Sequence, residues 1–269
     1  MGNELDIKLA KLASERRLIP FIGAGFSIPL GLPSWEELIR RLAPKLNWDP
    51  DVFMQSGNRN YLQMAEYFVS KKSKGELRRE IEKDLRIDPA KLSSSKSHEL
   101  LVKLNPHSIY TTNYDDGIEE AFKFYNLPHS VIRNINDMKT AESGATSIYK
   151  FHGDLNDDES LVITETNYFE RLEFEDPLDI RLRSDILDNT LLFLGYSLND
   201  INARYMFYKL SKINRKLKKH SDSCTAIMVT FGISDIQREI LNSWGIEIKE
   251  LDPSTKTQSV VEFLDKLTS

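Results

Sequence analysis

Short runs of consecutive apolar residues recur along the 269-residue chain and alternate with longer stretches of helical periodicity. Apolar runs of strand length predict strands that are buried on both faces of a parallel sheet. We expect strands at Leu18–Ile22, Ser108–Tyr110, Ser147–Phe151, Ser160–Ile163, Thr190–Leu194, Ala226–Thr230 and Ile246–Lys249. Helical patterns lie at Trp35–Leu46, Asp116–Tyr125, Ile201–Leu217, Ser234–Trp244 and Ser259–Leu267. This alternation predicts an α/β fold with a doubly wound parallel sheet.

One interval breaks the alternation. Residues 36–104 contain helical patterns at Tyr61–Ser70, Gly75–Leu85 and Lys96–Leu104 and no convincing strand. We therefore expect a single domain over residues 1–269, with a helical insertion subdomain at 36–104. The length of the chain suits one large α/β domain.

Composition disfavours several classes of protein. No apolar run approaches the roughly 18 residues of a membrane-spanning helix, and the charged N-terminal segment lacks the apolar core of a signal peptide. Cys224 is the only cysteine, which excludes disulfides and cysteine-based zinc sites within one chain and favours a reducing cytoplasm. The net charge of −5 disfavours direct nucleic-acid binding. Basic runs at 71–80 and 214–220 are interpreted as solvated helix faces.

Ligands of open α/β sheets bind outside the carboxyl ends of the strands, so the residues that follow each strand are the candidates. After the first strand, Gly23-Ala24-Gly25-Phe26-Ser27 permits a tight turn and close approach to a phosphate. Alone, this motif fits an ordinary strand–helix turn equally well. Ile28 replaces the third glycine of the dehydrogenase pattern, and Pro29, Gly31 and Pro33 suit a loop that folds over a ligand.

Polar groups also follow later strands. Asn113 offers a donor and an acceptor together, which suits an amide-bearing ligand, whereas Asp115 fits a helix cap at least as well. His152, followed by glycine, is the best general-base candidate among the five histidines, with a structural histidine as the alternative. Gly195 and Ser197 suit phosphate or ribose oxygens, or a helix cap.

In this order, Gly-Ala-Gly-x-Ser, Thr-x-Asn-x-Asp, His-Gly and Gly-x-Ser resemble the sirtuin family of NAD-dependent enzymes, which have a Rossmann-like sheet. The resemblance runs from about Leu18 to the final strand. It is strongest over Gly23–Pro33, where the family spacing Gly-Ala-Gly-x-Ser-x-x-x-Gly-x-Pro is matched without a gap.

The resemblance implies roles for individual residues. His152 would be the catalytic base near the ribose hydroxyls, and Asn113 and Asp115 would border the nicotinamide and its ribose. Trp35 falls where the family carries a phenylalanine over the nicotinamide pocket. The implied NAD-binding residues are Gly23, Ala24, Gly25, Ser27, Trp35, Thr112, Gly195 and Ser197.

The sequence also departs from the family. Pro33-Ser34-Trp35-Glu36 replaces the family's Pro-Asp-Phe-Arg, and Thr111-Thr112-Asn113 replaces Thr-Gln-Asn. One cysteine cannot build the four-cysteine zinc module of deacylating sirtuins, so we expect no zinc and interpret the helical insertion as a replacement for that module. The pattern is similar to sirtuin-like domains of bacterial antiphage defence systems, which consume NAD. Water, rather than an acylated lysine, would then take the ribosyl carbon.

The resulting hypothesis is an NAD+ hydrolase that releases nicotinamide and ADP-ribose. A protein deacylase or ADP-ribosyltransferase, and a catalytically silent NAD- or ADP-ribose-binding scaffold, remain alternatives. Because uncontrolled NAD hydrolysis would kill the host, we expect control by homo-oligomerisation or by a separate partner such as an ATPase. The amphipathic segment Leu5–Leu12 is a candidate contact, with core packing as the alternative.

Overall fold

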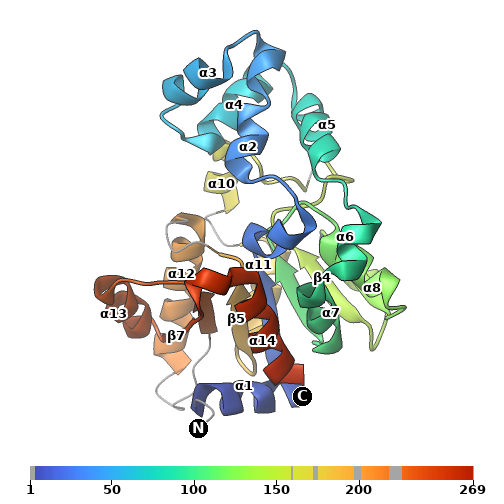
Figure 1. The fold of residues 1–269 in the computed structure, drawn as a ribbon, viewed down its shortest axis with the longest axis vertical. Coiled ribbons are helices and arrows are strands. Elements are labelled where there is room, and N and C mark those ends of the chain that lie inside the picture. Colours follow the sequence, from blue (N-terminus) through green and yellow to red (C-terminus); the bar gives the residue numbers. More distant parts are fainter. Residues whose placement is uncertain (1–3, 159, 172–174, 197–200, 218–225, 269) are drawn as a thin grey trace.

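A seven-stranded parallel sheet forms the centre of the molecule, as the computed structural model shows for residues 4–158, 160–171, 175–196, 201–217 and 226–268 (Figure 1). The strand order is β3-β4-β2-β1-β5-β6-β7, and all neighbouring strands are parallel. The strands are β1 (Leu18–Ile22), β2 (Ser108–Thr111), β3 (His129–Ile132), β4 (Thr146–Lys150), β5 (Thr190–Leu194), β6 (Ala226–Thr230) and β7 (Ile246–Glu250). The predicted doubly wound parallel sheet is confirmed.

Helices cover both faces of this sheet. Alternate residues of β1 divide between the two faces: Leu18 and Ile22 join one buried cluster, whereas Ile19 and Phe21 join the other. The first cluster includes side chains of α1 (Glu4–Ser14), α6 (Pro89–Ser94), α7 (Lys96–Lys103), α8 (Gly117–Phe124) and α14 (Lys256–Thr268). The second includes side chains of α9 (Ile135–Thr140), α11 (Pro177–Asp185), α12 (Ile201–Leu217) and α13 (Asp235–Ser243).

The N-terminal amphipathic segment packs into the core. Leu9 and Ala13 of α1 are buried, and Leu5 and Leu12 pack against the same cluster, beside α14. Ile7, which is 66% exposed, is the large apolar side chain of α1 that faces outward. Of the two readings of Leu5–Leu12, the structure therefore shows core packing.

A third buried cluster lies in the helical segment at the top of Figure 1. Its helices are α2 (Trp35–Arg40), η2 (Ala43–Leu46), α3 (Pro50–Ser56), α4 (Tyr61–Lys71) and α5 (Lys74–Asp84). Leu155, Leu161 and Ile163, which follow β4, complete this cluster, and α10 (Glu165–Arg171) packs on α4. Within residues 36–104, α6 and α7 instead pack on the sheet. The insertion subdomain at 36–104 stays a prediction.

One strand prediction was wrong, and one strand was not predicted. Ser160–Ile163 forms no strand; its apolar side chains Leu161 and Ile163 are buried against the helical segment instead of in a ladder. The edge strand β3 was missed because its short sequence, His-Ser-Val-Ile, is mostly half-buried and carries little apolar signal. The remaining predicted strands are confirmed. The pattern at Trp35–Leu46 divides into α2 and η2, with Pro44 near the start of the second helix.

Backbone packs directly against backbone where the chain leaves β1 and β5. The chain continues from β1 to one side of the sheet and returns to β5 on the other, so this is the topological switch point. The Gly25 N–H donates to the Gly195 carbonyl at 2.9 Å. A Cβ at Gly23 would lie 2.8 Å from the Gly195 carbonyl oxygen, and a Cβ at Gly195 would lie 2.4 Å from the Phe26 nitrogen. These glycines therefore permit the two loops to meet.

This packing predicts a large cost for Gly195→Ala. Gly195 has a φ of +77° and no room for a methyl group, whereas Gly144 has a φ of +86° and open space around it. We expect Gly195→Ala to lower the free energy of unfolding by about 3 kcal/mol, from backbone strain plus overpacking, and Gly144→Ala by about 1 kcal/mol from strain alone. Urea denaturation measures both, and equal losses would contradict the packing argument.

Candidate functional site

The loops that follow β1, β2, β4, β5 and β6 line one cleft of about 1250 Å³. Trp35 and Tyr61 of the helical segment and Thr257 of α14 also line it. The structure brings most of the predicted site residues to this cleft, namely Ala24, Gly25, Ser27, Trp35, Thr112, Asn113, Asp115, His152 and Gly195. Gly23 contacts the site through its carbonyl, and Ser197 lies outside the described residues.

The glycine-rich segment is more regular than predicted. Ala24–Leu30 forms the 3-10 helix η1, which ends at Gly31 with a φ of +73°. The N–H groups of Gly23 and Gly25 already donate to the carbonyls of Leu194 and Gly195. A ligand at this loop would therefore contact the backbone and N–H groups other than those of Gly23 and Gly25. The short helix η1 places the Ser27 side chain facing the loop after β2.

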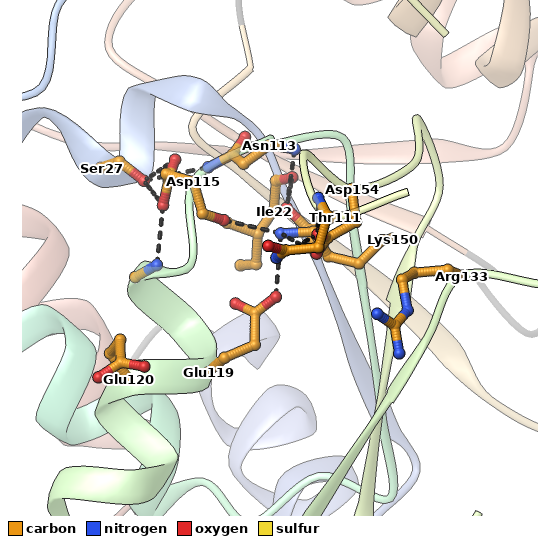
Figure 2. Close-up of polar contacts among 12 residues, drawn as sticks. Ile22, Ser27, Thr111, Asn113, Asp115, Glu119, Glu120, Arg133, Lys150 and Asp154 are labelled. Atoms are coloured by element: carbon orange, nitrogen blue, oxygen red, sulfur yellow. Dashed lines mark hydrogen bonds and ion pairs between the residues drawn. The ribbon is translucent and has the colours of Figure 1, made fainter. Parts of the chain in front are cut away.

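Asn113, Ser27 and Asp115 form one buried hydrogen-bond network (Figure 2). The Asn113 Nδ2 donates to the Ser27 Oγ at 3.1 Å and to the Gly23 carbonyl at 3.3 Å. The Ser27 hydroxyl donates to the Asp115 carboxylate at 3.0 Å. The Asn113 Oδ1 is buried and accepts no hydrogen bond from the described residues. A buried acceptor without a donor is costly, and a ligand N–H or a water would remove that cost.

Asp115 combines the two roles that its sequence position left open. Its Oδ1 accepts the Gly117 N–H at the start of α8 at 3.0 Å, as a helix-capping residue would, and the same carboxylate faces Ser27. Burial raises the pKa of Asp115, an effect opposed by the nearby Lys150 ammonium and by the Gly117 N–H. The carboxylate thus sits at the point where the helix and the cleft meet.

Lys150 was missed as a site residue. Its side chain is fully buried at the end of β4, and its Nζ donates to the Asp115 carbonyl at 2.7 Å (Figure 2). The Nζ also lies 2.9 Å from Glu119 of α8 and 3.9 Å from Asp154. These anions outweigh the effect of burial and raise the pKa of Lys150, so the ammonium stays charged. A lysine two residues before His152, directly after Ile148 and Tyr149 of a predicted buried strand, is the sequence signal that could have revealed it.

His152 also lines the cleft and is 8% exposed. Burial, with a further effect from the Arg171 guanidinium, lowers its pKa to about 3, so the imidazole is neutral near pH 7. Its Nδ1 is 3.3 Å from the Tyr168 hydroxyl, and its carbonyl accepts the Val162 N–H at 2.9 Å. Arg171 itself is held by Asp179 at 2.7 Å. The structure therefore presents His152 as an uncharged, firmly held imidazole.

Aromatic side chains make up much of the remaining wall. The Trp35 ring lies 6.0 Å from the ring of Tyr114, and both line the cleft. Thr112 shares a hydrogen bond of 2.8 Å with the Tyr196 hydroxyl. The sequence analysis did not identify Tyr114, Tyr168 and Tyr196 as site residues. A single tyrosine in a loop or helix does not indicate which group its hydroxyl contacts in the fold.

The described residues contain no group of three or more His, Cys, Asp or Glu side chains placed to hold a metal ion. Nor does any helix among them have the length and apolar character needed to span a membrane.

Comparison with known proteins places this site in a family context. The SIR2-like domain family matches residues 107–249. The "NAD(+) hydrolase ThsA" of Acinetobacter baumannii (strain 532279) is 30% identical over 206 residues, which cover 76% of this chain and 41% of that protein. "Defense-associated sirtuin 2" of Bacillus subtilis is 25% identical over 211 residues, covering 77% of this chain and 20% of that protein. The chain spans less than half the length of these relatives.

A solved structure, of a Sir2 homologue in complex with NAD, has the same fold. Its TM-score is 0.50 at 14% sequence identity, and the match covers 100% of this chain and 97% of that one.

The buried ammonium predicts a strong effect of Lys150→Met. Loss of Lys150 leaves the Glu119 carboxylate, 5% exposed, without its counter-ion, and breaking such a pair costs about 3–5 kcal/mol of unfolding free energy. Lys123→Met is the matched control, because its pair with Glu120 lies on the same helix but is exposed, and such pairs contribute about 0–1 kcal/mol. Urea denaturation measures both variants. The double variant Lys150→Met/Glu119→Gln should recover part of the loss; no recovery would contradict the pairing.

Proposed function

Because the chain belongs to the SIR2-like domain family, we propose that it is an NAD+ hydrolase that releases nicotinamide and ADP-ribose. The observation that carries the proposal is the cleft at the switch point, where the free Asn113 Oδ1 and the neutral His152 line one space. Its volume of about 1250 Å³ suits a dinucleotide, since pockets for drug-sized ligands span roughly 300–1000 Å³. The naming of ThsA relatives as NAD(+) hydrolases supports the same reaction.

In the proposed reaction, Asn113 binds the leaving nicotinamide and His152 accepts a proton. The Asn113 Oδ1 accepts an N–H of the nicotinamide carboxamide, which satisfies its buried lone pairs. The bond between the nicotinamide nitrogen and the ribose C1′ breaks, and its electron pair leaves with neutral nicotinamide. The water oxygen bonds to C1′, and its proton passes to the neutral His152, directly or through a ribose hydroxyl.

Electrostatics assist this step. The ribose gains oxocarbenium character as the bond breaks, and a preorganised negative group nearby stabilises that positive charge. Asp115 is the candidate for such a group: Ser27 and Gly117 hold its carboxylate, and the Lys150 ammonium opposes the effect of burial, which raises the Asp115 pKa. We assign Asp115 to orienting and stabilising the site rather than to bond formation.

The dinucleotide would lie along the loops of the switch point. We propose that Gly23, Ala24, Gly25 and Gly195 give its phosphates close access to the backbone, that Thr112 and Ser27 border the ribose, and that Trp35 covers the nicotinamide. The glycine packing after β1 and β5 supports this, because it lets the two loops lie directly against each other at the edge of the cleft. Ser197 is retained in the proposal on its sequence position alone.

Nicotinamide release tests the function. Purified protein incubated with NAD should release nicotinamide and ADP-ribose, and His152→Ala or Asn113→Ala should each lower kcat by about 10²–10⁴-fold, because each removes a group that acts on the reacting bond. His129→Ala, on the edge strand β3, should retain activity and serves as the control. Absence of turnover in every assembly state would overturn the proposal. NAD-dependent deacylation of an acylated peptide would favour the deacylase, and binding without turnover would favour the scaffold.

We further propose that the enzyme acts in antiphage defence by depleting NAD in the cytoplasm, and that self-association or a partner such as an ATPase controls it. The name of the Bacillus subtilis relative supports the defence role, and the single cysteine supports the compartment. Exposed Ile236 and Ile240, four residues apart on one face of α13, support a contact surface.

Sizing chromatography coupled to the nicotinamide assay tests the self-association. Activity should follow the larger species, and Ile236→Asp should reduce both, because a carboxylate opposes burial of that face. Ile135→Asp, at a comparably exposed position on α9, is the control. A monomer with full activity would contradict control by assembly.

A further inference from the structure

The Arg59 guanidinium is a positive charge without a partner at the edge of the cleft. Among the described residues, the charged side chains that line the cleft are those of Arg59, Asp115 and Lys256. Within the same described part of the chain, no hydrogen bond or ion pair joins the Arg59 guanidinium to another group. A guanidinium carries several N–H donors in a planar fork, a geometry that matches the oxygens of a phosphate. Arg59 therefore presents phosphate-binding donors whose acceptors are not supplied by the fold.

The backbone holds Arg59 in a conformation that arginine seldom adopts. Arg59 lies in the turn between α3 and α4, where Asn58 has a φ of +47° and Arg59 a φ of +55°. The left-handed region is costly for residues other than glycine, and asparagine tolerates it better than arginine. The Arg59 N–H donates to the Met54 carbonyl at 3.3 Å, and the Asn60 N–H donates to the Gly57 carbonyl at 2.8 Å. Glycine would fit this turn at a lower cost, so the strained arginine points to a function of its side chain.

The loops of the switch point offer little positive charge to an anionic ligand. The N–H groups of Gly23 and Gly25 already donate to carbonyls of the fold. The Asp115 carboxylate lines the same cleft and adds negative charge to it. A doubly anionic pyrophosphate therefore needs cations from other parts of the chain.

Position 36 does not supply such a cation. Glu36 stands where the sirtuin family has an arginine, and its carboxylate accepts the Tyr61 hydroxyl at 2.7 Å. Among the described residues that line the cleft, the cations are Arg59 and Lys256. The counter-charge for a pyrophosphate in this cleft thus depends on these two side chains.

We propose that Arg59 is a substrate-binding residue whose guanidinium pairs with the pyrophosphate of NAD, together with the Lys256 ammonium. This inference rests on the proposed function, because it assigns a partner to one group of the same substrate. Arg59 belongs to the helical segment, whereas Lys256 begins α14, which packs on the sheet (Figure 1). Pairing with one anion joins these two parts of the molecule around the dinucleotide. The helical segment thus contributes charge to the binding site.

Substitution by glycine separates the role of the side chain from that of the backbone. Arg59→Gly removes the guanidinium and relieves the left-handed strain, so we expect the Tm to rise by about 2–4 °C. The Kd for ADP-ribose should rise about 10–100-fold in the same variant, because a hydrogen-bonded charge pair is lost. ADP-ribose keeps the pyrophosphate of NAD and lacks the bond that the proposed reaction breaks. Isothermal titration calorimetry with ADP-ribose therefore measures binding without turnover.

Arg16→Gly is the matched control. Arg16 also has a φ of +55°, but its Nε donates to the Asn105 carbonyl at 2.9 Å and it does not line the cleft. This variant should leave the Kd for ADP-ribose and the KM for NAD unchanged. Arg59→Lys should recover most of the affinity that Arg59→Gly loses, because an ammonium keeps the charge. Added salt should weaken ADP-ribose binding more in the wild type than in Arg59→Gly, because salt screens the pairing of charges.

The outcomes separate this inference from the proposed function. An Arg59→Gly variant with the wild-type Kd for ADP-ribose and the wild-type KM for NAD would overturn the binding role and leave NAD hydrolysis standing. Binding of ADP-ribose that depends on Arg59, in a protein that hydrolyses no NAD in any assembly state, would overturn the proposed function and support the binding role. A lower Tm in Arg59→Gly would contradict the argument from strain, because it would show that the arginine stabilises the turn.

Discussion

The buried ammonium of Lys150 is the interaction on which the rest of the site depends. It extends from the end of β4 beneath the loop after β2, where it binds the Asp115 carbonyl and the Glu119 carboxylate. A buried charge is tolerated only when its partners are in place, so Lys150 requires β2, β4 and the start of α8 to keep one arrangement. Asn113, Asp115 and His152 project from the loops that this ammonium joins.

Two kinds of contact hold the loops around this ammonium in place. On the side of β1 and β5, glycines let the backbones of the two loops pack directly against each other at the edge of the cleft. On the side of β4, the Val162 N–H donates to the His152 carbonyl, and the Tyr168 hydroxyl lies 3.3 Å from the His152 Nδ1. The segment after β4 also contributes Leu161 and Ile163 to the core of the helical segment. The orientation of His152 is therefore coupled to the packing of that segment.

Sequence reasoning predicted the fold and the cleft-lining loops well, for a physical reason. A continuous apolar run of strand length, such as Leu18–Ile22, is typical of a strand buried on both faces of a parallel sheet. Parallel strands bring the residues that follow them to one edge of the sheet. The same reasoning misread Ser160–Ile163, because burial against helices and burial in a ladder require the same apolar residues. The apolar pattern also could not find β3, which is half-buried at the sheet edge.

The residues that sequence reasoning missed act through single atoms. Lys150, Tyr114 and Tyr168 matter because of what one nitrogen or one hydroxyl contacts across the fold, and such contacts join positions far apart along the chain. Their arrangement is not the one that stability alone would favour. Among the described residues, the site keeps a buried Asn113 oxygen without a donor, a buried Asp115 carboxylate and a buried neutral histidine, although an apolar core would avoid these costs. Unsatisfied groups that converge on one cleft are the physical mark of a site completed by its ligand.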